Sequence, residues 1–414
     1  MPHANWAGNY SYRADRLHRP GTLEQVQEIV SRAPHVRVLG SRHAFNAIAD
    51  SGELLSLDAL PADVVVDRAG TVSFGAALRY GELATVLDAA GLALHNLASL
   101  PHISIAGAVA TATHGSGDAN GNLATAVAGL EIVTSTGEIV SASRGDADFD
   151  GLVVGLGALG AVTRVTLDVE PAYEVRQRVF EGLGWEALFE HLDEITASGY
   201  SVSVFSLWGE TSRQVWVKSR DADPVRPDLF GARAATTDLH PIPGHDPVNC
   251  TQQLGVPGPW SDRLQHFRMG FTPSSGEELE SEYLIPRAQA VAAIEAVRGL
   301  ADAIRPLLQV TEIRTVAADR LWMSPQYGRD TVGIHFTWKR EQSAVERVLV
   351  DIEAALEPFG ARPHWGKLFV AGSAAIGPLY ERLPDFARMA ERLDPRGAFR
   401  NRWLTERVLG SMTA

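Results

Sequence analysis

Two segments built from small residues constrain this chain more than any other feature. The first, Gly40–Asn46, reads Gly-Ser-Arg-His-Ala-Phe-Asn and follows a short apolar run. The second, His102–Gly117, consists almost wholly of small residues. Small residues let the backbone approach a flat or phosphorylated ligand closely, and successive N–H groups can then bind its anionic oxygens. The two segments therefore predict a large dinucleotide held mainly by main chain, which indicates a flavin.

Composition narrows the class of protein. A chain of 414 residues, 45% apolar and 21% charged, is typical of a globular enzyme with two domains. The net charge of −13 opposes nucleic-acid binding, which needs a basic surface. No apolar run approaches the ~20 residues of a membrane span, and the N-terminus has no secretory pattern. We therefore expect a cytoplasmic protein that uses neither a membrane nor a nucleic acid.

A single cysteine, Cys250, excludes an internal disulfide and any zinc site built from several cysteines. We expect no metal. Cys250 lies in residues 221–259, a stretch rich in Pro, Gly and Asp that predicts a long irregular excursion.

Hydrophobic periodicity predicts an α+β chain. Up to residue 171, short strands alternate with helices, and Thr22–Gln25 has the spacing of a capping box. Residues 172–375 favour an antiparallel sheet covered by helices. The strands expected there are Ser201–Trp208, Val215–Ser219, Glu282–Ile285, Val310–Ala317, Gly333–Trp338 and Leu368–Ala371; the helices are Trp185–Thr196, Arg287–Arg298 and Glu341–Leu356.

Two of these strands carry polar residues on one side. Strand alternation puts Glu312 and Arg314 on the same face, and it puts His335 and Thr337 opposite an apolar face. Lys367 likewise alternates with apolar neighbours. From the residues alone, this polar face is either the floor of a pocket or a solvated surface with ion pairs.

In its ordered set of motifs the chain resembles the vanillyl-alcohol-oxidase type of FAD-linked oxidoreductases. Within that type it is similar to the alditol (xylitol, sorbitol) oxidases, which are relatives of the sugar-lactone oxidases. The motifs are Asn5–Tyr10, Gly40–Asn46, Leu97–Ser104, His114–Gly117, Glu312–Arg314, His335–Lys339, His364–Lys367 and Asn401–Trp403. They span essentially the whole chain.

This resemblance implies a two-domain FAD-binding fold of the vanillyl-alcohol-oxidase/PCMH type with an antiparallel-sheet substrate cap. The expected divisions are 1–171 for the FAD-binding domain, 172–375 for the cap and 376–414 for a C-terminal return to the FAD domain. It also implies FAD attached covalently through His43; read alone, His43 could equally be a turn histidine bonded to backbone. Because Cys250 lies outside both flavin loops, we expect a single link and a structural role for that cysteine.

The resemblance also implies the site residues. The expected flavin contacts are Gly40, Ser41, Arg42, His43, Ala44, Asn46, Ser99, Ser104, Gly107, Thr111, His114, Gly115, Ser116, Gly160 and Val162. Glu312 and Ser104 would bind substrate hydroxyls, and Arg314 and Lys367 would hold the oxygens at C1 and C2. Lys367 and His335 are both candidates to accept the hydroxyl proton, and His335 could instead only orient its neighbours.

The expected reaction is oxidation of the terminal hydroxyl of an alditol to the aldose, with O2 reoxidising the flavin to give H2O2, in a monomer. The alternatives are an aldonolactone (gulono- or galactono-lactone) oxidase or dehydrogenase and a catalytically silent flavin-binding protein. A nicotinamide enzyme is disfavoured because Gly155–Gly160, which has the Gly-x-Gly-x-x-Gly spelling, leads into an expected strand and not a helix.

Overall fold

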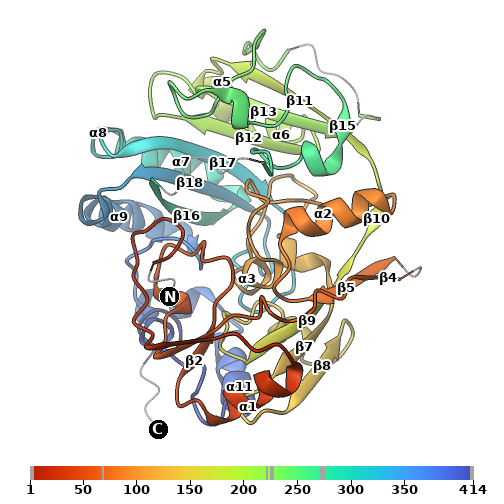
Figure 1. The fold of residues 1–414 in the computed structure, drawn as a ribbon. Coiled ribbons are helices and arrows are strands. Elements are labelled where there is room, and N and C mark those ends of the chain that lie inside the picture. Colours follow the sequence, from red (N-terminus) through yellow and green to blue (C-terminus); the bar gives the residue numbers. More distant parts are fainter. Residues whose placement is uncertain (1–3, 68–69, 221, 224–227, 271–276, 411–414) are drawn as a thin grey trace.

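The computed structural model describes residues 4–67, 70–220, 222–223, 228–270 and 277–410 (Figure 1). Helices and antiparallel sheets form two modules, as expected for the α+β class. Asp221 and residues 224–227 of the expected excursion lie outside the described residues. Within the described part, no helix combines the length and the apolar character needed to cross a membrane.

The N-terminal module contains two main sheets. A parallel sheet has the order β1-β3-β2, and an antiparallel sheet has the order β4-β5-β9-β7-β8. The strands are β1 (Arg16–His18), β2 (Val36–Val38), β3 (Glu53–Leu55), β4 (Val65–Asp67), β5 (Thr71–Gly75), β7 (Val127–Val133), β8 (Ile139–Ser143) and β9 (Ala161–Asp168). Because β9 begins directly after Gly160, the Gly155–Gly160 motif does lead into a strand.

Capping residues mark the start of one helix and the end of another in this module. Helix α1 (Leu23–Arg32) begins after Thr22, whose hydroxyl accepts a hydrogen bond from the Gln25 amide at 3.3 Å. Helix α2 (Tyr80–Ala89) ends before Gly91, which has φ +71°. The second small-residue segment contains helix α3 (Ile105–Ala110), and α4 (Phe149–Leu152) follows β8. Strands β6 (Leu92–Ala93) and β10 (Glu170–Pro171) pair with each other.

The second module is a nine-stranded antiparallel sheet in the order β14-β11-β13-β12-β17-β18-β16-β19, with β15 paired to β11. Its strands are β11 (Glu174–Glu181), β12 (Ser201–Ser206), β13 (Gln214–Arg220), β14 (Arg233–Ala234), β15 (Gly258–Pro259), β16 (Glu278–Pro286), β17 (Leu308–Val316), β18 (Thr331–Lys339) and β19 (Arg362–Pro363). Helices α7 (Ala290–Arg298) and α9 (Gln342–Leu356) pack together, and α7 contacts β16 and β18. Ile334, Phe336 and Trp338 of β18 are fully buried.

Three expectations for this module were wrong. Residues Leu368–Ala371 form no strand; they follow a turn in which Lys367 N donates to His364 O. Strand β11 was missed. The helix expected at Trp185–Thr196 is divided into α5 (Trp185–Glu190) and α6 (Leu192–Thr196), because His191 has the non-helical dihedrals φ −122°, ψ 29°. The short helix α8 (Ala301–Ile304) completes the module.

The C-terminal segment packs on the N-terminal module, beside α1 and β2 (Figure 1). It contains α10 (Ser373–Ile376), α11 (Leu383–Leu393) and α12 (Arg402–Leu404). The amide of Val36 donates to Ala398 O at 2.8 Å, and the Asn401 side chain donates to three backbone carbonyls between residues 47 and 50. These contacts support a C-terminal return. The sheets support a division near residue 171, since among the described residues the nine-stranded sheet begins at β11.

Candidate active site

A cavity of about 270 Å³ lies where loops of the N-terminal module face the nine-stranded sheet. We call its two sides the loop wall and the sheet wall. The loop wall consists mainly of residues 37–49 and 98–114, and the sheet wall of residues from β16, β17 and β18 together with Gly366 and Lys367. A third side is formed by Phe205, residues 240–242, His245, His266 and Phe267.

The loop wall places backbone against the cavity. Arg42 has φ +65°, a left-handed conformation that turns the segment sharply. Ser41 N donates to Ser104 Oγ at 3.2 Å, and Ser104 N donates to Ser41 Oγ at 2.8 Å, so the two small-residue segments are joined directly. A Cβ added at Gly40 or at Gly107 would press on Ser104 Oγ. Alanine at either position would therefore displace the Ser104 hydroxyl.

His43 supplies an imidazole to the loop wall. Its imidazole stacks on Trp6, with ring centroids 5.1 Å apart. Both ring nitrogens are shielded from solvent and have no hydrogen-bond partner among the described residues. Burial lowers the pKa of His43 to about 4, so the ring is neutral at pH 7 and carries a free lone pair.

The sheet wall is organised by strand register. Glu312 pairs with His335, and His335 pairs with Glu282, so three neighbouring strands place these side chains in one row on one face. Arg314 lies two residues along β17 on the same face, while Ile313 points into the opposite, apolar side and is 2% exposed. The polar face, which the sequence alone could not assign to a pocket or to the solvated surface, is thus buried against the cavity.

Glu282 is the centre of this wall, and the sequence analysis missed it. Its Oε1 accepts from Arg314 Nη2 at 2.8 Å, and its Oε2 accepts from Lys367 Nζ at 2.7 Å. The signal was present: Glu278, Glu280 and Glu282 alternate along β16 in Glu-Leu-Glu-Ser-Glu. Because the expected strand began only at Glu282, the alternation of carboxylates was not visible.

Lys367 contacts two further groups, Glu280 Oε2 at 3.2 Å and His335 Nδ1 at 2.7 Å. His335 Nε2 lies 3.1 Å from Thr337 Oγ1. An ammonium has three N–H donors, and here each meets an acceptor, so His335 Nδ1 accepts and its Nε2 carries the proton that is donated to Thr337. The side chains of Lys367 and His335 therefore act as one hydrogen-bonded unit.

The charges of this wall stabilise one another. Burial disfavours ionisation of Glu282, but Arg314, Lys367 and His114 together hold its pKa well below the usual range. Burial acts against the charge on Arg314 as well, and the neighbouring Glu282 and Glu312 raise the pKa of that guanidinium. The sheet wall is thus a fixed array of ionised groups rather than a set of neutral ones.

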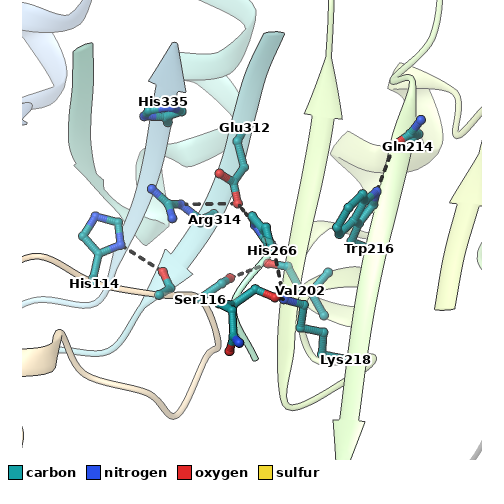
Figure 2. Close-up of polar contacts among 12 residues, drawn as sticks. His114, Ser116, Val202, Gln214, Trp216, Lys218, His266, Glu312, Arg314 and His335 are labelled. Atoms are coloured by element: carbon teal, nitrogen blue, oxygen red, sulfur yellow. Dashed lines mark hydrogen bonds and ion pairs between the residues drawn. The ribbon is translucent and has the colours of Figure 1, made fainter. Parts of the chain in front are cut away.

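Glu312 has a second partner that the sequence analysis did not identify. His266 Nε2 lies 2.8 Å from Glu312 Oε1, on the side away from Arg314 (Figure 2). His266 belongs to the segment after the irregular excursion. That excursion also supplies His240, Pro241, Ile242 and His245 to the cavity, which no local pattern indicated.

The structure brings most of the predicted site residues to this cavity and leaves five outside it. Those that line it are Gly40, Ser41, Arg42, His43, Ala44, Ser99, Ser104, Gly107, Thr111, His114, Glu312, Arg314, His335 and Lys367. Asn46, Gly115, Ser116, Gly160 and Val162 do not line it.

These five residues have other contacts. Asn46 donates to the carbonyls of Trp365 and Lys367, and Ser116 Oγ donates to Val202 O. Gly115 packs on Leu97, and Gly160 packs on β7. Val162 lies in β9, and Leu156 and Gly157 line the cavity instead of Gly160 and Val162.

His114, Glu282 and His364 have ligand atoms within 4.8 Å of one another, as in a metal site. The surroundings oppose that function. Arg314 and Lys367 both contact Glu282 directly and would repel a cation there. His364 Nδ1 already accepts from Gly366 N at 3.1 Å. We interpret the group as part of the charge network.

Comparison with known proteins now identifies this architecture. An FAD binding domain model matches residues 14–143, and a D-arabinono-1,4-lactone oxidase model matches residues 272–407. Alditol oxidase from a Streptomyces species is 51% identical over 98% of this chain and 99% of its own. The chain belongs to the alditol oxidase family of FAD-linked oxidoreductases.

Two more distantly similar proteins match this chain over almost its full length. L-Gulono-1,4-lactone dehydrogenase from Mycobacterium tuberculosis is 28% identical over 98% of this chain and 99% of its own. Cholesterol oxidase from B. sterolicum superposes with a TM-score of 0.77 at 16% identity, covering 97% of this chain and 95% of that one. This likeness shows the common fold. By sequence identity, the gulonolactone dehydrogenase at 28% is less similar to this chain than the alditol oxidase at 51%.

Proposed function

We propose that this protein oxidises the terminal hydroxyl of alditols such as xylitol and sorbitol to the aldose, with O2 as electron acceptor and H2O2 as second product. The observation that carries the proposal is the sheet wall. It presents the buried, ionised Glu312 and Arg314 and the partly buried Lys367 to a cavity whose opposite side is built from small residues. A polyol has several hydroxyls, each of which donates and accepts, and such a wall can bind them at both kinds of group.

The residues of the loop wall fit FAD. The glycines at 40 and 107 keep the space that a Cβ would fill, and His43 offers an unpaired buried nitrogen. Residues 40–44 would hold the cofactor from one segment, and Ser99, Ser104, Gly107, Thr111 and His114 from the other. When bound, FAD supplies the hydride acceptor and passes the electrons to O2.

We further propose a single covalent link from His43 to the flavin. A neutral imidazole with a free lone pair is the form that can bond to a flavin carbon, and burial keeps His43 neutral. Forming the bond would release one hydrogen from that carbon and one from the imidazole as two protons, and O2 would take up the two electrons to give H2O2. Cys250 is the single cysteine of the chain, and it packs with Val179 and Trp216 in a separate apolar cluster. In His43→Ala, acid denaturation should release flavin into the supernatant, while in the unchanged protein the colour should stay with the pellet. Colour retained by His43→Ala would overturn the link.

Substrate roles follow from the charges. Arg314 and Lys367 would hold the oxygens at C1 and C2, Lys367 by turning toward the substrate the N–H that now meets Glu280 at 3.2 Å. Fixed positive charge there stabilises alkoxide character as the C1 hydride departs. Glu312 would accept a hydrogen bond from a hydroxyl further along the chain. Ser104 could assist, although its hydroxyl already bonds Ser41.

The hydroxyl proton has a defined destination in this arrangement. Lys367 Nζ would first pass a proton to His335 Nδ1 across their 2.7 Å hydrogen bond, and the lone pair thus freed on Nζ would take the hydroxyl proton. The resulting imidazolium would lie beside Glu282, whose Oε2 is 3.7 Å from His335 Nδ1. We therefore propose the Lys367–His335 unit as the proton acceptor.

The second candidate is oxidation of a sugar lactone, which the match of residues 272–407 to the D-arabinono-1,4-lactone oxidase model favours. The deciding measurement is the flavin absorption band under argon before and after xylitol or gulono-lactone. Bleaching by xylitol alone would support alditol oxidation, and bleaching by the lactone alone would overturn it. Readmitting air then tests O2 as acceptor. The cytoplasmic location and the monomeric state stay predictions, and gel filtration tests the second.

A further inference from the structure

A buried lysine lies behind the substrate carboxylate. Lys218, on β13, is 1% exposed, and none of the ion pairs found among the described residues includes it. Its Nζ donates to the carbonyl oxygens of Leu264 and Gln265, the latter at 2.9 Å. The third contact is with His266 Nδ1 at 3.0 Å. Burying this ammonium costs free energy, because only neutral acceptors surround it directly.

The direction of these hydrogen bonds can be deduced. Two carbonyls can only accept, so two N–H groups of Lys218 point to them. If Lys218 also donates to His266 Nδ1, the imidazole proton is on Nε2 and is donated to Glu312 Oε1. In the opposite tautomer, the Nε2 lone pair would face a carboxylate oxygen at 2.8 Å, which is repulsive. The contacts therefore select one tautomer.

Aromatic rings hold His266 in place. The ring of Trp216 meets it edge to face with centroids 5.3 Å apart, and the ring of Phe205 does so at 5.6 Å. These neighbours limit rotation of the imidazole and exclude water from it. The arrangement lies between β12, β13 and β17, with Glu312 facing Arg314 on its other side (Figure 2).

We propose that Lys218 and His266 are positioning residues that hold Glu312 as an ionised acceptor with Oε1 occupied, so that Oε2 receives a substrate hydroxyl. The proposal rests on the proposed function for the identity of that hydroxyl. It adds a requirement: the group recognised at Glu312 must be a hydrogen-bond donor, and a bare carbonyl or ether oxygen is rejected there.

Charge and burial are consistent with this arrangement. Burial lowers the pKa of His266 to about 4, so its ring stays neutral. Burial disfavours the Glu312 carboxylate, yet Arg314 and the bond from His266 keep its pKa below the usual value. Burial also lowers the pKa of Lys218 to about 7, against the attraction of Glu312. Cys250 and Arg314 are the other titratable or charged groups acting on Lys218, so below pH 7 the ammonium form prevails.

The kinetic test compares His266→Leu, His266→Gln and Lys218→Met at about pH 6. Glutamine can present an N–H where His266 Nε2 stands, so it is the matched variant that keeps the donor. Flavin reduction under argon is followed with xylitol and with 1,2-propanediol, which has the first two hydroxyls and none beyond. For xylitol, His266→Leu and Lys218→Met should weaken apparent binding about tenfold, with a smaller change in the limiting rate, and His266→Gln should restore most of the loss. For 1,2-propanediol the change should stay within about threefold.

Equal losses for both substrates, or no rescue by glutamine, would overturn the positioning function. A second measurement does not depend on activity. In protein with ¹⁵N-labelled histidine, assigned by the signal lost in His266→Gln, His266 should carry its proton on Nε2, and Lys218→Met should shift the tautomer population. A proton on Nδ1 would overturn the proposal even if xylitol is a good substrate. Failure of xylitol to bleach the unchanged protein would instead overturn the proposed function, and the NMR result would still decide the tautomer.

Discussion

The loop wall and the sheet wall of one cavity are built on opposite principles. The loop wall uses backbone and small residues, joined by the Ser41–Ser104 hydrogen bonds, and it carries His43, both of whose ring nitrogens lack a hydrogen-bond partner among the described residues. The sheet wall uses charged side chains that are almost completely buried, and Glu282 connects two cations within it. A wall of backbone is damaged by added atoms, whereas a wall of balanced charges is damaged by removing one of them.

Removal of a reacting charge should have the largest effect. Lys367→Met deletes the ammonium that contacts Glu282, Glu280 and His335, and with it the proton path. We expect flavin reduction by xylitol to slow by about 10²–10⁴ while flavin stays bound. Stopped-flow absorbance measures the rate. Lys339→Met is the matched control, because Lys339 is exposed at the end of β18 and its Nζ donates only to Pro306 O among the described residues. An unchanged rate would remove Lys367 from the mechanism.

Glu282→Gln tests the balance within the sheet wall. Neutral glutamine leaves Arg314 and Lys367 with less compensation, so we expect unfolding to become easier by about 3 kcal/mol. Glu280→Gln is the comparison, since its carboxylate is more exposed and contacts Lys367 at 3.2 Å. Urea denaturation measures the free energy of unfolding of both variants. Equal destabilisation would contradict the special position of Glu282.

Lowering the pH should reduce the free energy of unfolding through His266, on the third side of the cavity. Its folded pKa of about 4 lies below the ordinary value of 6.5, so the unfolded chain binds a proton first as the pH falls. Its contribution is complete above about pH 6.5 and is lost as the pH approaches 4. At pH 5 this loss amounts to about 2 kcal/mol. His266→Gln should flatten the acid limb of a plot of unfolding free energy against pH, and an unaltered limb would refute the assignment.

Added atoms should break the loop wall, with the smallest expected effect. Gly40→Ala puts a methyl group against Ser104 Oγ, so in a His43→Ala background we expect flavin to bind about tenfold more weakly. Adding Ser104→Ala should recover part of the loss by removing the hydroxyl. Gly52→Ala is the matched control, since no described atom lies within 4 Å of its Cβ position. Titration followed by flavin fluorescence reports the dissociation constants, and identical values for both glycine variants would sink the idea.

The features of this site that depend on residues close together in sequence could be predicted. Strand alternation placed Glu312 and Arg314 on one face and His335 opposite the apolar residues of β18, and the structure confirms both. Capping at Thr22 was also confirmed. The division into a loop wall and a sheet wall followed from these patterns together with the family resemblance.

What remained unpredicted depends on contacts between distant segments. Lys218 and His266 meet across 48 residues, and neither residue has a neighbour in sequence that indicates the pair. The excursion residues reach the cavity through irregular backbone, for which no periodicity exists. Lys367 was expected within a strand-like alternation, but it lies in a turn whose place is fixed by tertiary hydrogen bonds.

One of those bonds has a consequence for how the protein is made. Asn46, in the loop that would hold the cofactor, donates to the carbonyl of Lys367, 321 residues later. Just before this loop, the amide of Val36 in β2 donates a hydrogen bond to the carbonyl of Ala398. During synthesis the first small-residue segment therefore leaves the ribosome long before its partners exist. We expect cofactor capture to wait for about the last eighth of the chain. Ribosome-bound chains halted before Trp365 should therefore stay colourless, and only completed ones should turn yellow.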